Sequence, residues 1–81
     1  MESNETTIYR DPLKNHIVYM LRKNTEGQWQ ISKRIGRGKW RKNRGPWKQE
    51  TQAREELTAF VWSNGLIREV YDDDRFAHGY D

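Results

Sequence analysis

The chain has 81 residues, of which 33% are hydrophobic and 33% are charged, and it contains no cysteine. This length leaves room for one domain with a modest core, and the lack of cysteine excludes a disulfide framework and a thiolate zinc site. Four Trp, four Tyr and two Phe favour a folded domain over a disordered chain. The longest apolar runs, 17–21 and 59–62, are too short to cross a membrane, and the acidic N-terminus is unlike a signal peptide. We therefore expect a soluble intracellular protein.

The net charge of +3 conceals an uneven distribution of charge. Residues 27–49, called the basic window below, contain eight cations and no carboxylate. The rest of the chain holds seven cations and all twelve acids, so the balance is +8 inside the window and −5 outside it. Such segregation creates a local positive field that the net charge does not reveal.

The first predicted elements are an arm and a β-hairpin. Residues 1–14 lack hydrophobic periodicity and are expected to form a flexible N-terminal arm. Strands are predicted at 16–23 and 28–35, joined by a turn at 24–27. Alternation places the following side chains on one face of each strand: Ile17, Tyr19 and Leu21 on the first, and Trp29, Ile31, Lys33 and Ile35 on the second.

The segment after the hairpin is rich in turn-forming residues. Gly36-Arg37-Gly38 predicts a tight turn or bulge, because it is too short for a phosphate-binding glycine loop. Residues 39–42 fit either a short third strand or a loop. Residues 43–46 are expected to be irregular, with Pro46 at the entry to a helix.

A helix is predicted from about Lys48 or Thr51 to Ser63. One apolar stripe indicates it, formed by Ala53, Leu57, Phe60 and Val61. Gly65 is expected to end the helix in the left-handed conformation. Residues 66–71 alternate as a possible last strand, and residues 72–81 are expected to form an acidic C-terminal tail.

These elements predict an α+β fold for a single domain over residues 15–71. A small antiparallel β-hairpin or three-stranded sheet would pack against one α-helix, with a possible extra C-terminal strand. No catalytic constellation is visible: the two histidines, His16 and His78, have no metal-binding spacing, and the aspartates at 72–74 lack the spacing of a calcium loop. We therefore expect a protein that is not an enzyme and uses no cofactor or metal.

The basic window is the feature with most chemical content. Its Lys and Arg side chains can contact phosphates and displace condensed counterions, and a tryptophan among cations suits stacking on bases. The predicted nucleic-acid-binding residues are Arg34, Arg37, Lys39, Trp40, Arg41, Lys42 and Arg44. The purely structural interpretation is that Trp29 lies in the core, Trp47 packs at the helix entry and the cations form a solvated face.

A pattern of strand, basic stretch and helix runs through residues 17–66. It comprises Trp29-Gln30-Ile31-Ser32-Lys33, the cations up to Lys42, and Ala53-x-x-x-Leu57-x-x-Phe60. This pattern resembles the small sheet-plus-helix DNA-binding modules of phage integrase arms and plant ethylene-response factors. In those families the sheet lies in the major groove and the helix braces its back. The resemblance implies DNA rather than RNA as the partner, and it implies these groove-facing residues: Arg34, Arg37, Lys39, Trp40 and Arg41.

A small regulatory or inhibitor protein, for example one of viral type, is the competing hypothesis. The same cations would then meet an acidic groove on a nucleic-acid-processing protein. Trp40, Trp47 and Trp62 would act as anchors, because Trp and Arg dominate the binding energy of many protein interfaces. The sequence leaves open the strandedness of the nucleic acid and the oligomeric state.

Overall fold

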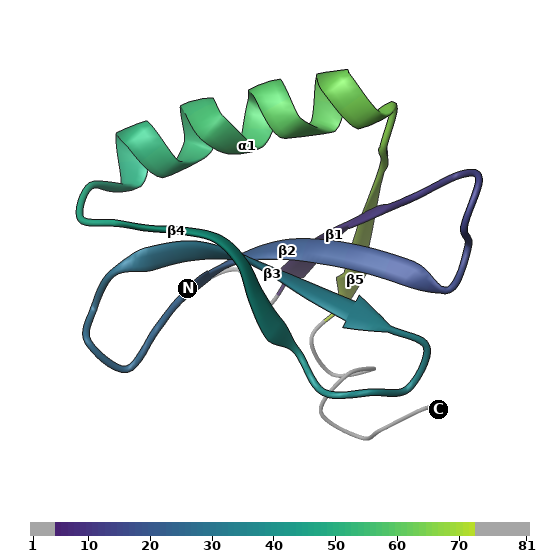
Figure 1. The fold of residues 1–81 in the computed structure, drawn as a ribbon, viewed down its shortest axis with the longest axis horizontal. Coiled ribbons are helices and arrows are strands. Elements are labelled where there is room, and N and C mark those ends of the chain that lie inside the picture. Colours follow the sequence, from purple (N-terminus) through teal and green to yellow (C-terminus); the bar gives the residue numbers. More distant parts are fainter. Residues whose placement is uncertain (1–4, 73–81) are drawn as a thin grey trace.

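The computed structural model describes residues 5–72 and shows an antiparallel sheet with one helix across it (Figure 1). The elements in chain order are β1 (Glu5–Arg10), β2 (Ile17–Lys23), β3 (Trp29–Ile35), β4 (Arg41–Trp47), α1 (Glu50–Asn64) and β5 (Ile67–Asp72). The five strands lie in the order β4-β3-β2-β1-β5. The α+β class predicted from the sequence is confirmed, with a larger sheet than the two or three strands expected.

The β2–β3 hairpin matches its prediction. The two strands pair along their whole length, from Ile17 opposite Ile35 to Lys23 opposite Trp29. In the turn, the Asn24 side-chain oxygen accepts the backbone N–H groups of Glu26 and Gln28, each at 2.9 Å. The turn chemistry read from the sequence therefore fixes the register of the hairpin.

The N-terminal segment differs from the prediction of an arm over residues 1–14. Glu5–Arg10 forms β1, which lies inside the sheet between β2 and β5. It pairs with β5 at six positions, from Glu5 opposite Asp72 to Arg10 opposite Ile67. The expectation was wrong because β1 is held by hydrogen bonds to a strand about 60 residues away. A local sequence pattern does not reveal such a distant partner. Its Ile8 side chain is 4% exposed.

The segment at 43–46, expected to be irregular, belongs to β4. This edge strand pairs with β3 through two register shifts, between Trp29 and Ile31 and between Ile31 and Ser32. Pro46 lies in β4 and not at the helix entry, since α1 begins at Glu50. An edge strand tolerates proline because one side of its backbone needs no sheet partner.

The core lies between α1 and the sheet. Ala53, Leu57 and Phe60 are the buried residues of the helix, as its apolar stripe predicted. The Tyr19 and Phe60 rings meet edge to face with centroids 4.9 Å apart. Gly65 ends the helix at φ 60°, and Leu66 then joins the core before β5 begins.

The helix covers only part of the sheet. It packs against β2, β3 and β4, so the side of β1 and β5 that faces the helix is less covered.

In the part of the chain that the structure describes, no helix is long and apolar enough to span a membrane. Of the predicted acidic tail at 72–81, Asp72 ends β5 and the remainder lies outside the described residues.

Candidate nucleic-acid interface

The basic window forms one hairpin at the edge of the sheet. Lys33 and Arg34 lie on β3, Arg37 and Lys39 lie in the turn, and further cations follow on β4. Gly36 has φ 59°, and the N–H of Gly38 donates to the carbonyl of Ile35 at 3.0 Å, as a tight turn requires. Seven of the eight cations of the window therefore lie on the β3–β4 hairpin, and Lys48 follows directly.

The strand register divides these cations between the two sides of the sheet. Lys33 lies opposite Arg41, and Lys33 also lies opposite the core residue Tyr19, so this pair is on the side that carries α1. Lys42 lies opposite Ser32 on the other side, which Arg34 shares by alternation. The sheet therefore does not place Arg34 and Arg41 on one common face.

A pocket of about 510 Å³ lies beside the turn of the hairpin. Four cations line it together with an isoleucine that is 55% exposed and a glycine: Lys33, Lys39, Arg41, Lys42, Ile35 and Gly38. Three of the predicted binding residues thus meet in one pocket with Lys33. Lys33 was not among the predicted binding residues, because alternation places it on the same face of its strand as Ile31. The pocket makes it a functional candidate.

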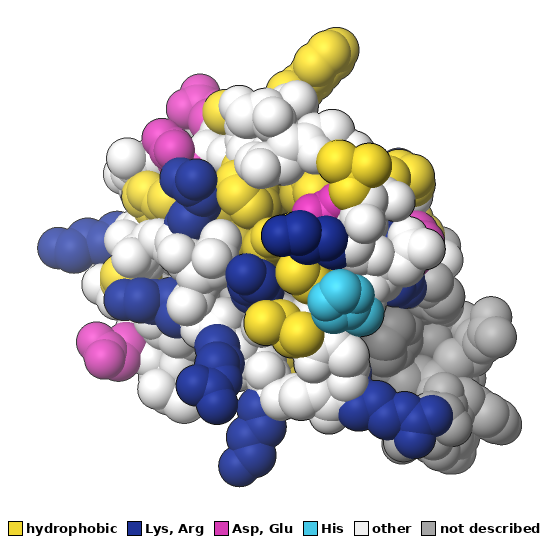
Figure 2. Space-filling view, turned by 45° about the vertical axis from the view of Figure 1, so that its right-hand side comes forward, with side chains coloured by type: hydrophobic (Ala, Val, Ile, Leu, Met, Phe, Trp, Pro, Cys, Tyr) yellow, Lys and Arg dark blue, Asp and Glu magenta, His cyan; other side chains and the backbone are white. Residues whose placement is uncertain are grey.

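Among the side chains that the structure describes, the cations of the hairpin have no acidic partner. The ion pairs among the side chains of residues 6–70 are Arg10 with Glu69 at 3.0 Å and Arg54 with Glu50 at 2.7 Å, both outside the basic window. Figure 2 shows Lys and Arg side chains outnumbering acidic ones over the face in view. The hairpin can therefore offer its charges to an external anion.

Arg44 is placed differently from the other predicted residues. Its guanidinium lies over the Phe60 ring, 4.7 Å from the centroid, at the margin of the core. Burial raises the pKa of the nearby Tyr19 hydroxyl and the Asp11 carboxylate adds to the rise, while Arg44 partly opposes it. Arg44 does not line the 510 Å³ pocket, so its first role is packing against the helix.

Arg34 and Trp40 are both half-buried. The Nε atom of Arg34 is buried and has no hydrogen-bond partner in the described structure. Ile8, Val18 and Ser32 are also buried although they lie on the side away from α1. The side of the sheet away from α1 is therefore covered around these residues and not open to solvent.

The loop between β1 and β2 brings two residues that the sequence reasoning missed. The N–H of Gly36 donates to the carbonyl of His16 at 2.6 Å, which joins this loop to the β3–β4 turn. Lys14 and His16, both exposed, thus lie at the same end of the sheet as Arg37 and Lys39. The signal was present in the hairpin register, since Ile17 opposite Ile35 places residue 16 beside residue 36.

The tryptophans occupy three kinds of environment. Trp29 lies opposite Trp47, with the Lys23 ammonium 5.5 Å from its ring centroid, and it is half-buried outside the buried core cluster. Trp47 packs against that cluster. Trp62 is 83% exposed on the outer side of α1. Of the three proposed protein anchors, Trp62 is thus the most accessible.

Comparison with known proteins adds no family to these observations. No protein-family model matches the chain, and no curated protein or solved structure shows significant similarity to it. Among the described residues, no group of three or more His, Cys, Asp or Glu side chains is placed to hold a metal ion. The class that the fold and the site support is a small α+β domain with a basic edge hairpin.

Proposed function

We propose that this protein binds nucleic acid, with DNA favoured over RNA, through the β3–β4 hairpin. The observation that carries the proposal is the direct opposition of Lys33 and Arg41 in a pocket lined by four cations. Like charges opposite each other on a sheet repel, and no carboxylate of the described residues lines this pocket to neutralise them. A phosphate group supplies the missing negative charge.

The division of cations between the two sides of the hairpin supports contact with more than one phosphate. Arg41 and Lys33 lie on one side, Lys42 and Arg34 lie on the other, and the turn adds Arg37. The major groove of DNA admits a two-stranded ribbon and has a row of phosphates along each wall. A hairpin with cations on both sides meets both rows. This arrangement favours duplex DNA over a single strand lying along one face.

Salt dependence of the affinity tests the proposal. Fluorescence anisotropy with duplex DNA, single-stranded DNA and RNA of one length gives the order of preference. Contact with about four phosphates predicts a slope of log K on log salt near −3.6, a loss of roughly 100-fold between about 50 and 200 mM salt. Affinity that does not change with salt would overturn the proposal.

Charge-matched variants separate the hairpin from general electrostatics. Arg41→Gln and Lys42→Gln remove cations that line the pocket, whereas Lys23→Gln removes one at the other end of β2. We expect each pocket variant to weaken binding about three- to tenfold at low salt and to make the slope shallower by about 1. If Lys23→Gln lowered the affinity for DNA as much as the pocket variants do, the binding would depend on net charge alone and not on the hairpin.

The exposure of Trp62 favours a second candidate function. Trp62 is 83% exposed, and Trp is enriched among the residues that dominate the binding energy of protein interfaces. In this reading the chain is a small regulator or inhibitor of a nucleic-acid-processing protein. Purification distinguishes the two: a high ratio of absorbance at nucleic-acid over protein wavelengths, lost after nuclease treatment, supports nucleic-acid binding. Capture of one protein partner that Trp62→Ala abolishes supports the second.

A further inference from the structure

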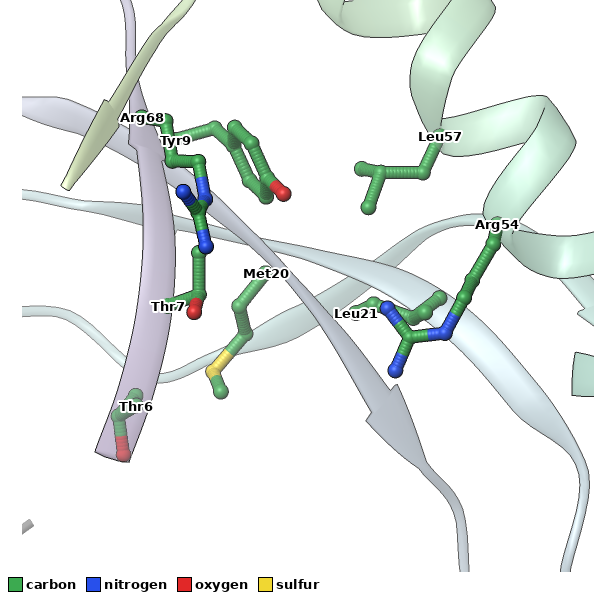
Figure 3. Close-up of a pocket in the computed structure, with 8 residues that line it drawn as sticks. All are labelled: Thr6, Thr7, Tyr9, Met20, Leu21, Arg54, Leu57 and Arg68. Carbon is green, nitrogen blue, oxygen red and sulfur yellow. The ribbon is translucent and has the colours of Figure 1, made fainter. Parts of the chain in front are cut away.

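A second pocket lies between α1 and the strands β1, β2 and β5, apart from the basic hairpin (Figure 3). Its volume is about 250 Å³. The residues that line it come from four elements: Thr6, Thr7, Tyr9, Met20, Leu21, Arg54, Leu57 and Arg68. None of these residues belongs to the basic window, so the proposed binding of nucleic acid by the hairpin does not account for this pocket.

The pocket exists because β1 and β2 diverge. These strands pair at Tyr9 opposite Tyr19 and at Arg10 opposite Val18, and their pairing does not continue toward Met20. Beyond this point β2 continues to pair with β3, and β1 continues to pair with β5. The helix packs over β2, β3 and β4 and does not fill the space over β1. The outer edge of β2 from Met20 to Lys23 therefore has no strand partner among residues 5–72.

Two arginines from distant parts of the chain point into this pocket. Glu50 accepts a hydrogen bond from Arg54 Nε at 2.7 Å, which holds the side chain so that its terminal nitrogens turn toward Leu21 (Figure 3). The Arg68 guanidinium reaches toward Thr7 from the opposite wall (Figure 3). In the described structure Arg68 has no ion pair. The site thus offers guanidinium donors from two walls.

The remaining lining is apolar with a few hydroxyl groups. Leu57 extends from α1 across from the Tyr9 ring, and Leu21 of β2 lies beside the Arg54 guanidinium (Figure 3). The pocket is smaller than the 300–1,000 Å³ usual for small-molecule sites, so its size suits a side chain rather than a nucleotide. A carboxylate next to an apolar group matches this chemistry.

We propose that this pocket binds an extended acidic peptide of a partner protein. The peptide backbone pairs with the open edge of β2, as in strand addition to a sheet. One Glu or Asp carboxylate lies between Arg54 and Arg68, and an apolar side chain two residues away rests on Leu21 and Leu57. The proposal concerns a different surface from the hairpin and does not depend on nucleic-acid binding.

The test is a titration of the full isotope-labelled chain followed by amide chemical shifts. The probe is acetyl-Thr-Val-Thr-Glu-Thr-amide, whose Val and Glu side chains share one face of a strand. We expect saturable shifts at Thr7, Met20, Leu21 and Arg68. The matched peptide with Gln in place of Glu is expected to bind at least about tenfold more weakly, because the charge-assisted hydrogen bonds are lost.

Protein variants make the test specific. Arg68→Gln is expected to weaken the Glu peptide about tenfold, with Arg54→Gln as a second variant in case the first perturbs β5. Arg37→Gln, which removes an equal charge from the β3–β4 turn, is expected to leave the affinity unchanged. Equal affinity for the Glu and Gln peptides, or shifts confined to the β3–β4 hairpin, would overturn the proposal. Inorganic phosphate that reproduces every shift at equal affinity would also overturn it, since the site would then bind simple anions.

Discussion

Lys33 and Arg41 lie directly opposite each other on β3 and β4, on the side of the sheet that carries α1. Neither makes an ion pair in the part of the chain that the structure describes. Like charges directly opposite each other destabilise a sheet, so we expect the Lys33–Arg41 pair to lower the stability of the free protein. If the hairpin binds nucleic acid as proposed, a bound phosphate is expected to relieve this repulsion, which would link the stability of the hairpin to binding.

The first prediction is that one substitution at the Lys33–Arg41 pair raises the stability of the protein and lowers its affinity for DNA. Arg41→Glu converts a repulsive cross-strand pair into an attractive one, so we expect the free energy of unfolding to rise by about 0.5 kcal/mol at low salt. The same change removes a cation from the pocket and adds a carboxylate, so affinity for duplex DNA should fall at least about tenfold. Urea unfolding and fluorescence anisotropy measure the two effects.

Lys39→Glu is the control for Arg41→Glu, because it makes the same change of charge at a position without a cross-strand partner. Lys39 lines the same pocket but lies in the β3–β4 turn and has no cross-strand partner in the register of β3 and β4. We expect weaker DNA binding without the gain in stability. Equal stabilisation by both variants would show that net charge, and not the Lys33–Arg41 pair, is responsible.

The second prediction concerns Arg44, whose guanidinium lies 4.7 Å from the Phe60 ring centroid. Loss of this cation–π contact in Arg44→Gln should lower the free energy of unfolding by about 1 kcal/mol. Arg37→Gln, in the exposed turn, should change it by less than about 0.5 kcal/mol. Denaturant midpoints provide the comparison. We also expect Arg44→Gln to weaken DNA binding less than Arg41→Gln, because Arg44 does not line the pocket.

The third prediction follows from Tyr19. Burial raises the pKa of its hydroxyl above the usual value of 10.0, so the unfolded chain loses this proton at a lower pH than the folded chain does. The contribution to stability is complete below pH 10.0 and is lost as the pH rises through the higher folded pKa. Unfolding free energies measured between about pH 9 and 11 should therefore fall less steeply in Tyr19→Phe than in the native chain. Identical slopes would contradict this assignment.

The fourth prediction compares two isoleucines on the same strand and the same side of the sheet. Ile31 is 0% exposed and Ile35 is 55% exposed. Ile31→Val should lower the free energy of unfolding by about 1 kcal/mol, because it removes a buried methylene and leaves a small cavity. Ile35→Val should have a small effect, within about 0.5 kcal/mol. Thermal or urea unfolding of both variants checks the placement of the core.

Local chemistry was sufficient to predict much of the centre of the chain. Alternating β-branched and aromatic residues predicted β2 and β3, and Asn24 to Gly27 predicted their turn. The stripe from Ala53 to Phe60 predicted α1, and Gly65 predicted its end. Each of these features depends on residues close together in the sequence, where periodicity and capping act directly.

The outer strands could not be predicted in the same way. β1 is held by β5, from the other end of the chain, and β4 reaches its pairing with β3 through two register shifts. β1 contains the strand-favouring run Thr6-Thr7-Ile8-Tyr9, but this run is short and its place inside the sheet depends on β5, whereas glycine and proline in β4 disfavour a strand by themselves. Their conformation is decided by hydrogen bonds to partner strands, which only tertiary structure supplies.

The same division holds for the basic window. The sequence alone determined its charge, eight cations without a carboxylate, and its position after a predicted hairpin. Tertiary structure decided which side of the sheet each cation occupies: it placed Lys33 opposite Arg41, Arg44 over the Phe60 ring, and His16 beside the β3–β4 turn. The reason is physical. Charge is a property of residues, whereas a binding surface is a property of the strand register and loop contacts that bring those residues together.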